Sequence, residues 1–281
     1  MRRASSFPVR GMLLAIWLAF ALFPIYWTVA TAFKTPIDIY QGPKYVPFID
    51  FHPTVMSWER LFGPQNFSFF KDFANSLLFG SMSALLAVLL GAFAAYGLAQ
   101  YRYKFGFYKN DDIAYLLVSQ RFMPPIVAVL AIYITYQKLS LLDSRLGMIL
   151  AYTAFDLPLA IFLLRNFFEQ IPVELEQAAA IDGYGKVERL LRVVFPLAAP
   201  GLAAAYMICF VFSWNDFLFA LILTFDNATT LPIMITNLNT QMQPMWWLLS
   251  AVGIVVMVPP VIVAVFLDRY MQRQVLRGGV R

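Results

Sequence analysis

Charged residues are scarce in this sequence. Of its 281 residues, 13% are Asp, Glu, Lys or Arg, while 60% are hydrophobic and 17% are aromatic. An ordinary soluble domain carries about 25% charged residues, so a single large soluble core explains this composition poorly. The low charge content and the long apolar runs instead predict a polytopic membrane protein.

Residues that build common catalytic and metal sites are also nearly missing. His52 is the only histidine and Cys209 the only cysteine, so histidine metal sites, Ser-His or Cys-His catalysis and an intrachain disulfide lack their material. The sequence has no G-x-x-x-x-G-K-[ST] phosphate loop either. We therefore expect no catalytic residue, no metal and no cofactor in this chain. The net charge of +5 does not indicate nucleic acid, because the basic residues lie mainly in loops and tails.

Six apolar segments are long enough to cross the roughly 30 Å core of a bilayer as helices. They cover residues 12–33, 75–100, 113–137, 146–168, 201–224 and 246–270. Three arginines precede the first segment, as in a signal peptide, but its length and Pro24 in mid-course favour a retained span. The predicted fold is all-α, with residues 1–281 forming a single transmembrane domain.

The distribution of basic residues predicts how these spans are oriented. Most basic residues lie before the first span, between the second and third, between the fourth and fifth, and in the tail after the sixth. By the positive-inside rule, both termini and the loop over residues 169–200 are cytoplasmic. The proline-rich residues 34–74 should pack on the opposite face, with a short helix around residues 54–61.

The loop over residues 169–200 is a long charged interruption between two apolar spans. Pro172 suits the start of a helix, and the glycines in residues 182–185 permit a turn that ends this helix. A second short helix is predicted over residues 186–194, ending before Pro196 because the residue that precedes a proline is disfavoured in the α conformation. Two short helices with a small-residue face suit docking into a groove of another protein.

Three charged residues lie inside apolar spans: Arg121, Asp156 and Asp216. Intramembrane charges are candidates for a functional site, although pairing between helices is an equally ordinary explanation. Trp214 and Asn215 accompany Asp216, and an indole, an amide and a carboxylate together match the needs of a polyhydroxylated ligand. Because these neighbours on a helix cannot all face one way, we expect about two of them to line a cavity.

The small residues, glycine and proline of the 169–200 loop resemble the EAA loop of ABC importer permeases, E-A-A-x-x-x-G followed nine residues later by I-x-L-P. The matching residues are Gln177, Ala178, Ala179, Gly183 and Pro196, with Gln177 in place of the glutamate, and Val193 and Phe195 in place of the isoleucine and leucine. Residues 121–125, 157–161 and 213–218 are similar to the carbohydrate-importer branch. Within that branch the chain resembles the shorter, six-span permease of the maltose-transporter type.

This resemblance implies a type I ABC importer permease fold and a heteromeric, binding-protein-dependent transporter for a sugar or polyol in the bacterial inner membrane. A second permease subunit, two ATPase subunits that bind ATP and Mg, and an extracytoplasmic solute-binding protein would be its partners. The loop would couple the chain to an ATPase through Glu176, Gln177, Ala178, Ala179, Asp182, Gly183 and Pro196. The chain itself would not be an enzyme.

Two other function classes stay open. An ion-coupled secondary transporter or channel would use Arg121, Asp156 and Asp216 as a charge relay, and it would be expected to show inverted repeats. No internal repeat is visible in the sequence. An integral-membrane enzyme is disfavoured because the sequence offers no cluster of metal ligands or nucleophiles.

Overall fold

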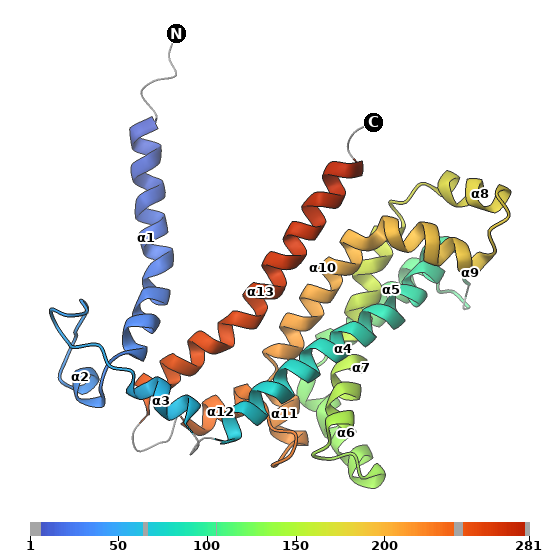
Figure 1. Ribbon diagram of the computed structural model, residues 1–281. Helices are drawn as coiled ribbons and strands as arrows, with labels where there is room; N and C mark the ends of the chain where they lie inside the picture. Colours follow the sequence, from blue (N-terminus) through green and yellow to red (C-terminus); the bar gives the residue numbers. More distant parts are fainter. Residues whose placement is uncertain (1–6, 64–66, 105, 239–243, 279–281) are drawn as a thin grey trace. The chain divides into compact units, whose positions relative to one another are not determined.

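The computed structural model describes residues 7–63, 67–104, 106–238 and 244–278, and helices dominate it (Figure 1). In chain order the elements are α1 Phe7–Ala32, α2 Pro36–Tyr40, α3 Met56–Phe62, α4 Phe67–Gln100, α5 Asn110–Ser119, the 3₁₀ turn η1 Gln120–Phe122, α6 Pro125–Leu139, α7 Arg145–Phe168, α8 Val173–Ile181, α9 Lys186–Arg189, the π-turn η2 Leu190–Val194, α10 Phe195–Trp214, α11 Leu218–Leu223, α12 Leu231–Leu238 and α13 Trp246–Gly278. No named strand occurs within these ranges, and the predicted all-α fold is confirmed.

Among the described residues, five helices are long and apolar enough to cross a membrane, or six candidate spans if one bent pair of helices is counted as a single span. The five are Arg10–Ala32, Ser68–Gln100, Arg145–Phe168, Lys186–Trp214 and Trp246–Arg269, and the pair is Asn110–Phe122 with Pro125–Leu139. Each of the six predicted segments overlaps one of them. The chain is therefore a multi-pass membrane protein.

The fifth span differs from the predicted residues 201–224. It runs over Lys186–Trp214, and the short helix α11 follows separately. Two side chains explain the break: the Asn215 amide donates to the carbonyl of Val211 over 2.8 Å, and Asp216 accepts from the N–H of Phe219 over 3.0 Å. Such local side-chain bonds end α10 and start α11. Asn215 and Asp216 therefore form a helix boundary and not the middle of the predicted span.

The prediction that a short helix ends before Pro196 is wrong. Leu190–Val194 form a π-turn, and the helix continues through Pro196 into α10. A proline inside an α-helix lacks the N–H for one bond, and its ring clashes with the carbonyl four residues earlier. The wider π-turn places an extra residue in that turn and lets the chain pass the proline. The predicted two-helix loop therefore contains one separate short helix, α8.

The chain forms two compact units, residues 1–70 with 234–258 and residues 71–233 with 259–281. In the first unit, Lys34 donates from Nζ to the carbonyl of Lys44 over 2.7 Å and lies 4.1 Å from the ring centroid of Trp27. The Tyr40 hydroxyl donates to the carbonyl of Pro244 over 2.9 Å. Helix α3 confirms the short helix predicted near residues 54–61, while the single domain over the whole chain stays a prediction.

The second unit is held together by two apolar clusters. The first joins α4, α7 and α10, and the second joins α4, α6, α7 and α11. Helices α4 and α7 approach closely at Gly91, where an added Cβ would lie 3.0 Å from that of Ala160. Small residues at such crossings let membrane helices pack without a hydrophobic driving force.

A single carboxylate organises the loop that follows α11. Asp143 accepts hydrogen bonds from the backbone N–H groups of Phe225, Asp226, Asn227 and Ala228, over 2.9 to 3.2 Å. Burial raises the pKa of the Asp143 carboxyl, but these four backbone donors outweigh burial and hold its pKa below the ordinary value of 3.8. The loop between α6 and α7 is thereby fastened to the loop after α11.

Replacing Asp143 by Asn should destabilise the protein by about 2 kcal/mol, because hydrogen bonds to a charged group contribute roughly 1.5–3 kcal/mol. Because the folded-state pKa is depressed, this contribution is present above pH 3.8 and is lost as the pH falls through the folded pKa. Thermal unfolding in detergent should therefore separate the two proteins at neutral pH and bring them together in acid. Asp226→Asn is the control, since its carboxylate is exposed and pairs with Lys71 at the surface; an equal loss there would contradict the interpretation.

Candidate functional site

The third span is broken where Arg121 lies. Helices α5 and η1 end at Phe122, α6 begins at Pro125, and the two segments meet at an angle of 87°. Met123 and Pro124 adopt extended backbone conformations between them. Because prolines cannot donate to a preceding turn and restrict the residue before them, the Pro124-Pro125 pair converts the predicted kink into a full break.

Arg121 pairs with Asp156 across this break. Its Nη1 lies 3.2 Å from Oδ1 of Asp156, and Asp156 is 2% exposed. The guanidinium also lies between two rings, 4.8 Å from the centroid of Phe155 and 4.6 Å from that of Phe212. A planar cation favours such aromatic faces. Two of the three predicted intramembrane charges are therefore joined in one ion pair.

Two serines extend this pair to other helices. The Ser213 hydroxyl of α10 donates to Oδ2 of Asp156 over 2.7 Å, and Ser83 of α4 lies 3.1 Å from Ser213, oxygen to oxygen. Arg121 belongs to η1 and Asp156 to α7, so the polar network links four membrane segments. Buried polar groups of this kind are stable only when each has a partner.

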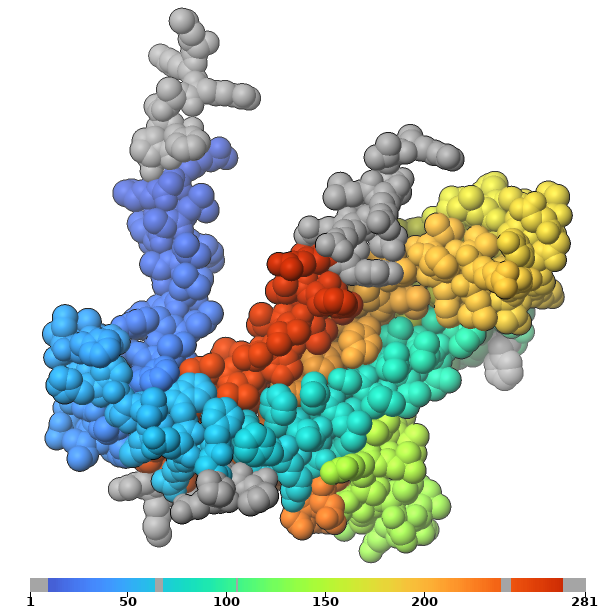
Figure 2. All heavy atoms as spheres, in the orientation of Figure 1, coloured from blue at the N-terminus to red at the C-terminus, as the bar shows by residue number. Residues whose placement is uncertain are grey.

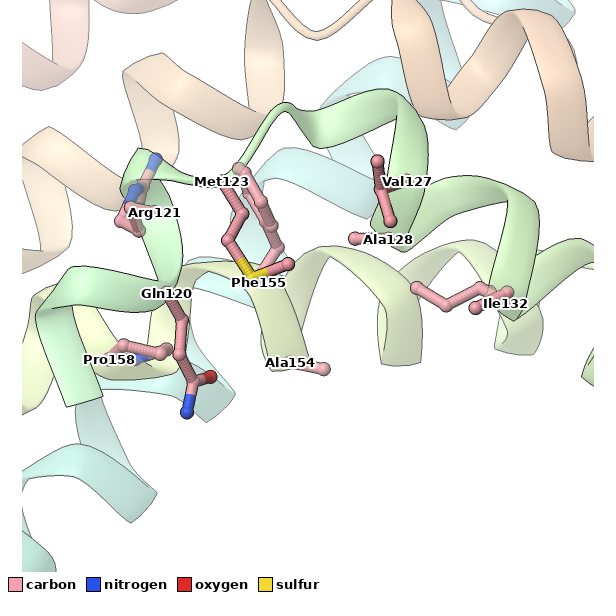
Figure 3. A pocket seen from close by; sticks show the side chains of 10 residues that line it. Gln120, Arg121, Met123, Val127, Ala128, Ile132, Ala154, Phe155 and Pro158 are labelled. Atoms are coloured by element: carbon pink, nitrogen blue, oxygen red, sulfur yellow. The ribbon is translucent and has the colours of Figure 1, made fainter. Parts of the chain in front are cut away.

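Two cavities flank the network. The larger, of about 370 Å³, lies at the break and is lined mainly by apolar side chains of η1, α6 and α7. Figure 3 labels Met123 and Phe155 among the side chains that line it, with Val127 and Ala128 on α6. The smaller, of about 60 Å³, is lined by Arg121, Tyr152, Phe155, Asp156, Phe212, Ser213 and Asp216.

The structure separates the three residues of the predicted ligand cluster. Trp214 is 2% exposed and packs against Phe73 and Phe210 at centroid distances of 6.0 and 5.7 Å. Its ring lies in the helix core, and a role for Trp214 in the solute pathway stays a prediction. Asn215 ends α10, and only Asp216 lines the small cavity.

The predicted coupling residues gather on α8 and the turn that follows it, at one end of the second unit (Figures 1 and 2). Gln177, Ala178 and Asp182 are exposed, whereas Ala179 is buried and Glu176 is half-buried. Gly183 has a φ of +89°, a conformation that glycine adopts without cost and other residues resist. Pro196 lies apart from them in α10 and is exposed.

The outer surface of α8 is unusually apolar for a segment rich in acidic residues. Ile181 is 87% exposed, and Val173 and Leu175 are also exposed. Exposed apolar side chains beside polar ones mark a surface suited to contact with another protein. This distribution, with small alanines between the larger side chains, agrees with the docking face that the sequence predicts.

Several site residues escaped sequence reasoning. Phe155 and Phe212, which hold the guanidinium, are ordinary aromatics in apolar runs and carry no distinguishing signal. Ser83 and Ser213 do carry one, because each is a hydroxyl within an apolar span. Tyr152 is a further case, because its hydroxyl is buried and its side chain lines the small cavity together with Asp216. Within the described ranges, no group of three His, Cys, Asp or Glu residues lies together to hold a metal.

Comparison with known proteins gives a consistent result. A family model described as "Binding-protein-dependent transport system inner membrane component" matches residues 87–277. The trehalose transport system permease protein SugB of Mycobacterium tuberculosis is 32% identical, with 100% of this chain and 98% of that protein covered. The sulfoquinovosyl glycerol transport system permease protein SmoH of Agrobacterium fabrum is 31% identical over 99% of this chain and 95% of that protein.

A solved structure shares the fold. It is a bacterial ABC transporter involved in the import of the acidic polysaccharide alginate. The matched chain superimposes with a TM-score of 0.75 at 22% identity, covering 96% of this chain and 99% of that one. The helix arrangement described above is therefore that of an ABC importer permease.

The Arg121–Asp156 pair can be tested by replacing one or both partners. Arg121→Met or Asp156→Leu alone should cost about 3–5 kcal/mol, because each leaves a buried charge without its partner, whereas the double variant should regain most of that loss. Thermal unfolding and monodispersity of the purified protein in detergent are the measurements. Arg145→Met, at the exposed start of α7, is the control. Simple addition of the two single losses in the double variant would argue against a direct pair.

Proposed function

Because the chain belongs to the family of binding-protein-dependent transport system inner membrane components, we propose that it is a permease subunit of an ATP-driven importer for a sugar or polyol. The match over residues 87–277, which includes α8 and the broken span, is the observation that carries this proposal. Relatives named for the transport of trehalose and sulfoquinovosyl glycerol support the carbohydrate class. The protein is a multi-pass component of the inner membrane.

The remaining subunits follow from this assignment. We propose a second permease subunit, two ATPase subunits and an extracytoplasmic solute-binding protein as partners, with ATP and Mg bound by the ATPases. The chain then acts as a gate and pathway and is not an enzyme. A solved alginate transporter in complex with its periplasmic protein matches this fold with a TM-score of 0.65, which supports such an assembly. The distribution of basic residues supports a cytoplasmic location for both termini.

Coupling to an ATPase is assigned to α8 and its turn. The exposed residues Gln177, Ala178 and Asp182 would contact the ATPase, Ala179 and Glu176 would face the permease, and Gly183 would set the turn. Closure of the ATPase dimer around ATP would then move α8 and switch the two permeases between inward- and outward-facing states. Pro196 would act differently, by fixing the π-turn through which α8 connects to the fifth span.

The solute pathway is assigned to the polar network and its cavities. Arg121, Asp156 and Asp216 line the small cavity, and Asn215 ends the helix beside it. Alternating access requires segments that change angle, and the 87° break next to Arg121 provides one. Arg121 and Asp156 already satisfy each other, which disfavours the alternative of an ion-coupled relay through free charges.

Uptake into proteoliposomes tests the proposal. The chain is reconstituted with its partner permease, its ATPases and its binding protein, and labelled trehalose, maltose, sulfoquinovosyl glycerol and sorbitol are offered in turn. We expect one of these solutes to accumulate only with internal ATP. An ATPase variant that binds but does not hydrolyse ATP is the control and should abolish uptake. Accumulation driven by an ion gradient alone, without ATPase subunits, would show that the proposal is wrong.

The turn after α8 offers a matched pair of glycines. Gly183→Val should reduce ATP-driven uptake by about tenfold or more, because a β-branched residue resists the positive φ of this turn. Gly185→Val should keep most activity, since Gly185 has a φ of −68° and both positions have open space within 4 Å. The measurement is uptake together with co-purification of the ATPases. Equal loss in both variants would point to close approach of a partner instead of backbone conformation.

A further inference from the structure

Helix α8 carries a partly buried carboxylate on its inner face. Glu176 and Ala179, three residues apart, lie on one face of the helix; Ala179 is buried and the Glu176 side chain is 13% exposed. The neighbouring Gln177 and Ala178 are exposed. The charge at this end of the coupling segment therefore points toward the permease and away from the surface that an ATPase would contact.

The Glu176 carboxylate joins three elements. Its Oε1 accepts a hydrogen bond from the hydroxyl of Tyr96, near the end of α4, and lies 3.9 Å from Nη1 of Arg189, in the first turn of the fifth span. Tyr96 is buried and packs edge-on against Phe168 of α7 at a centroid distance of 6.0 Å. The tyrosine is thus fixed in the core of the second unit, and the glutamate fastens α8 to it.

This contact is incomplete in one respect. Among the described residues, no hydrogen-bond partner is found for the buried Oε2 of Glu176 or the buried Nε of Arg189. A guanidinium and a carboxylate normally pair through two parallel hydrogen bonds, whereas the 3.9 Å between Nη1 and Oε1 is too long for a hydrogen bond. Beside them lies a cavity of about 230 Å³, lined by Gln100, Tyr101, Val173, Glu176, Gln177, Lys186 and Arg189. A small movement of α8 toward the fifth span therefore has room and brings the carboxylate within hydrogen-bond distance of the guanidinium.

We propose that Tyr96, Glu176 and Arg189 form a clasp that fastens the coupling helix to the second and fifth spans, and that pressure on α8 closes its arginine–carboxylate pair. This inference rests on the proposed function. The three residues are positioning residues: they contact neither solute nor nucleotide, and they convert a displacement of α8 into a displacement of α4 and α10. Without the clasp, α8 would move on its own when an ATPase pulls it.

The test uses the complete transporter in proteoliposomes and three minimal changes: Tyr96→Phe, Glu176→Gln and Arg189→Lys. Each variant has a matched control on the same element or beside it. Tyr101→Phe removes the hydroxyl of an exposed tyrosine, and Glu174→Gln removes an exposed charge of α8. Arg192→Lys replaces a guanidinium on a side chain that is 68% exposed. The probes are MgATP hydrolysis, co-purification of the ATPases, and ATP-driven uptake of the panel sugar that the wild type accumulates.

We expect the three clasp variants to keep wild-type ATPase co-purification and to hydrolyse ATP within about twofold of the wild type, while uptake per ATP falls by about tenfold. The double variant Tyr96→Phe/Glu176→Gln should be no worse than either single variant, because both remove the same contact. Arg189→Lys keeps the charge but cannot form two parallel bonds, so its loss of uptake would show that the closed pair is required. The three controls should transport like the wild type.

Two results would overturn the clasp. The first is wild-type uptake per ATP in Tyr96→Phe and Glu176→Gln. The second is a parallel loss of ATPase co-purification, hydrolysis and uptake in all three variants, which would show a role in folding alone. Absence of ATP-driven uptake in the wild type itself would instead overturn the proposed function, and the clasp with it.

Discussion

The ion pair between Arg121 and Asp156 is the contact on which the membrane part of this protein depends. Hydrocarbon offers no hydrogen bonds to a broken helix or to a lone charge, yet the third span is both broken and charged. The ion pair with Asp156 of α7 neutralises the charge of Arg121 and also fastens the broken span to α7. Ser213 and Ser83 extend the same network to α10 and α4. One polar cluster therefore holds four membrane segments together.

The sequence predicted the type and approximate position of the long apolar helices because hydrocarbon imposes length and apolarity directly on residues. It failed at Pro196 and at the fifth span, since a proline that usually ends a helix is accommodated there by a π-turn. It grouped Trp214, Asn215 and Asp216, of which only Asp216 lines the small cavity, because a run of adjacent residues does not say which face of a helix is buried. The contacts of Phe155 and Phe212 with the Arg121 guanidinium could not be predicted from the sequence, because they depend on helices that meet only in the folded protein.

Adjacent residues of α8 face different sides of the helix. Gln177 stands at the position where the motif carries a glutamate, and it is exposed; Glu176, one residue earlier, is turned inward by about 100° on the helix. The outer face of α8 consequently carries Gln177 and Ala178 at its centre and the exposed Glu174 one turn earlier, while the inner face holds the Glu176 carboxylate. The proposed function, in which an ATPase contacts one side of α8 and the other side moves the permease, has these two requirements.

The π-turn at Leu190–Val194 has a consequence for direction. An extra residue in one turn of a helix displaces everything before it by about 100° around the axis relative to a regular helix. The turn therefore sets the rotational phase between the membrane-embedded part of the fifth span and its first turn, where Arg189 lies. The distance from α8 to the bilayer depends on helix length, but the side on which α8 attaches depends on this single turn.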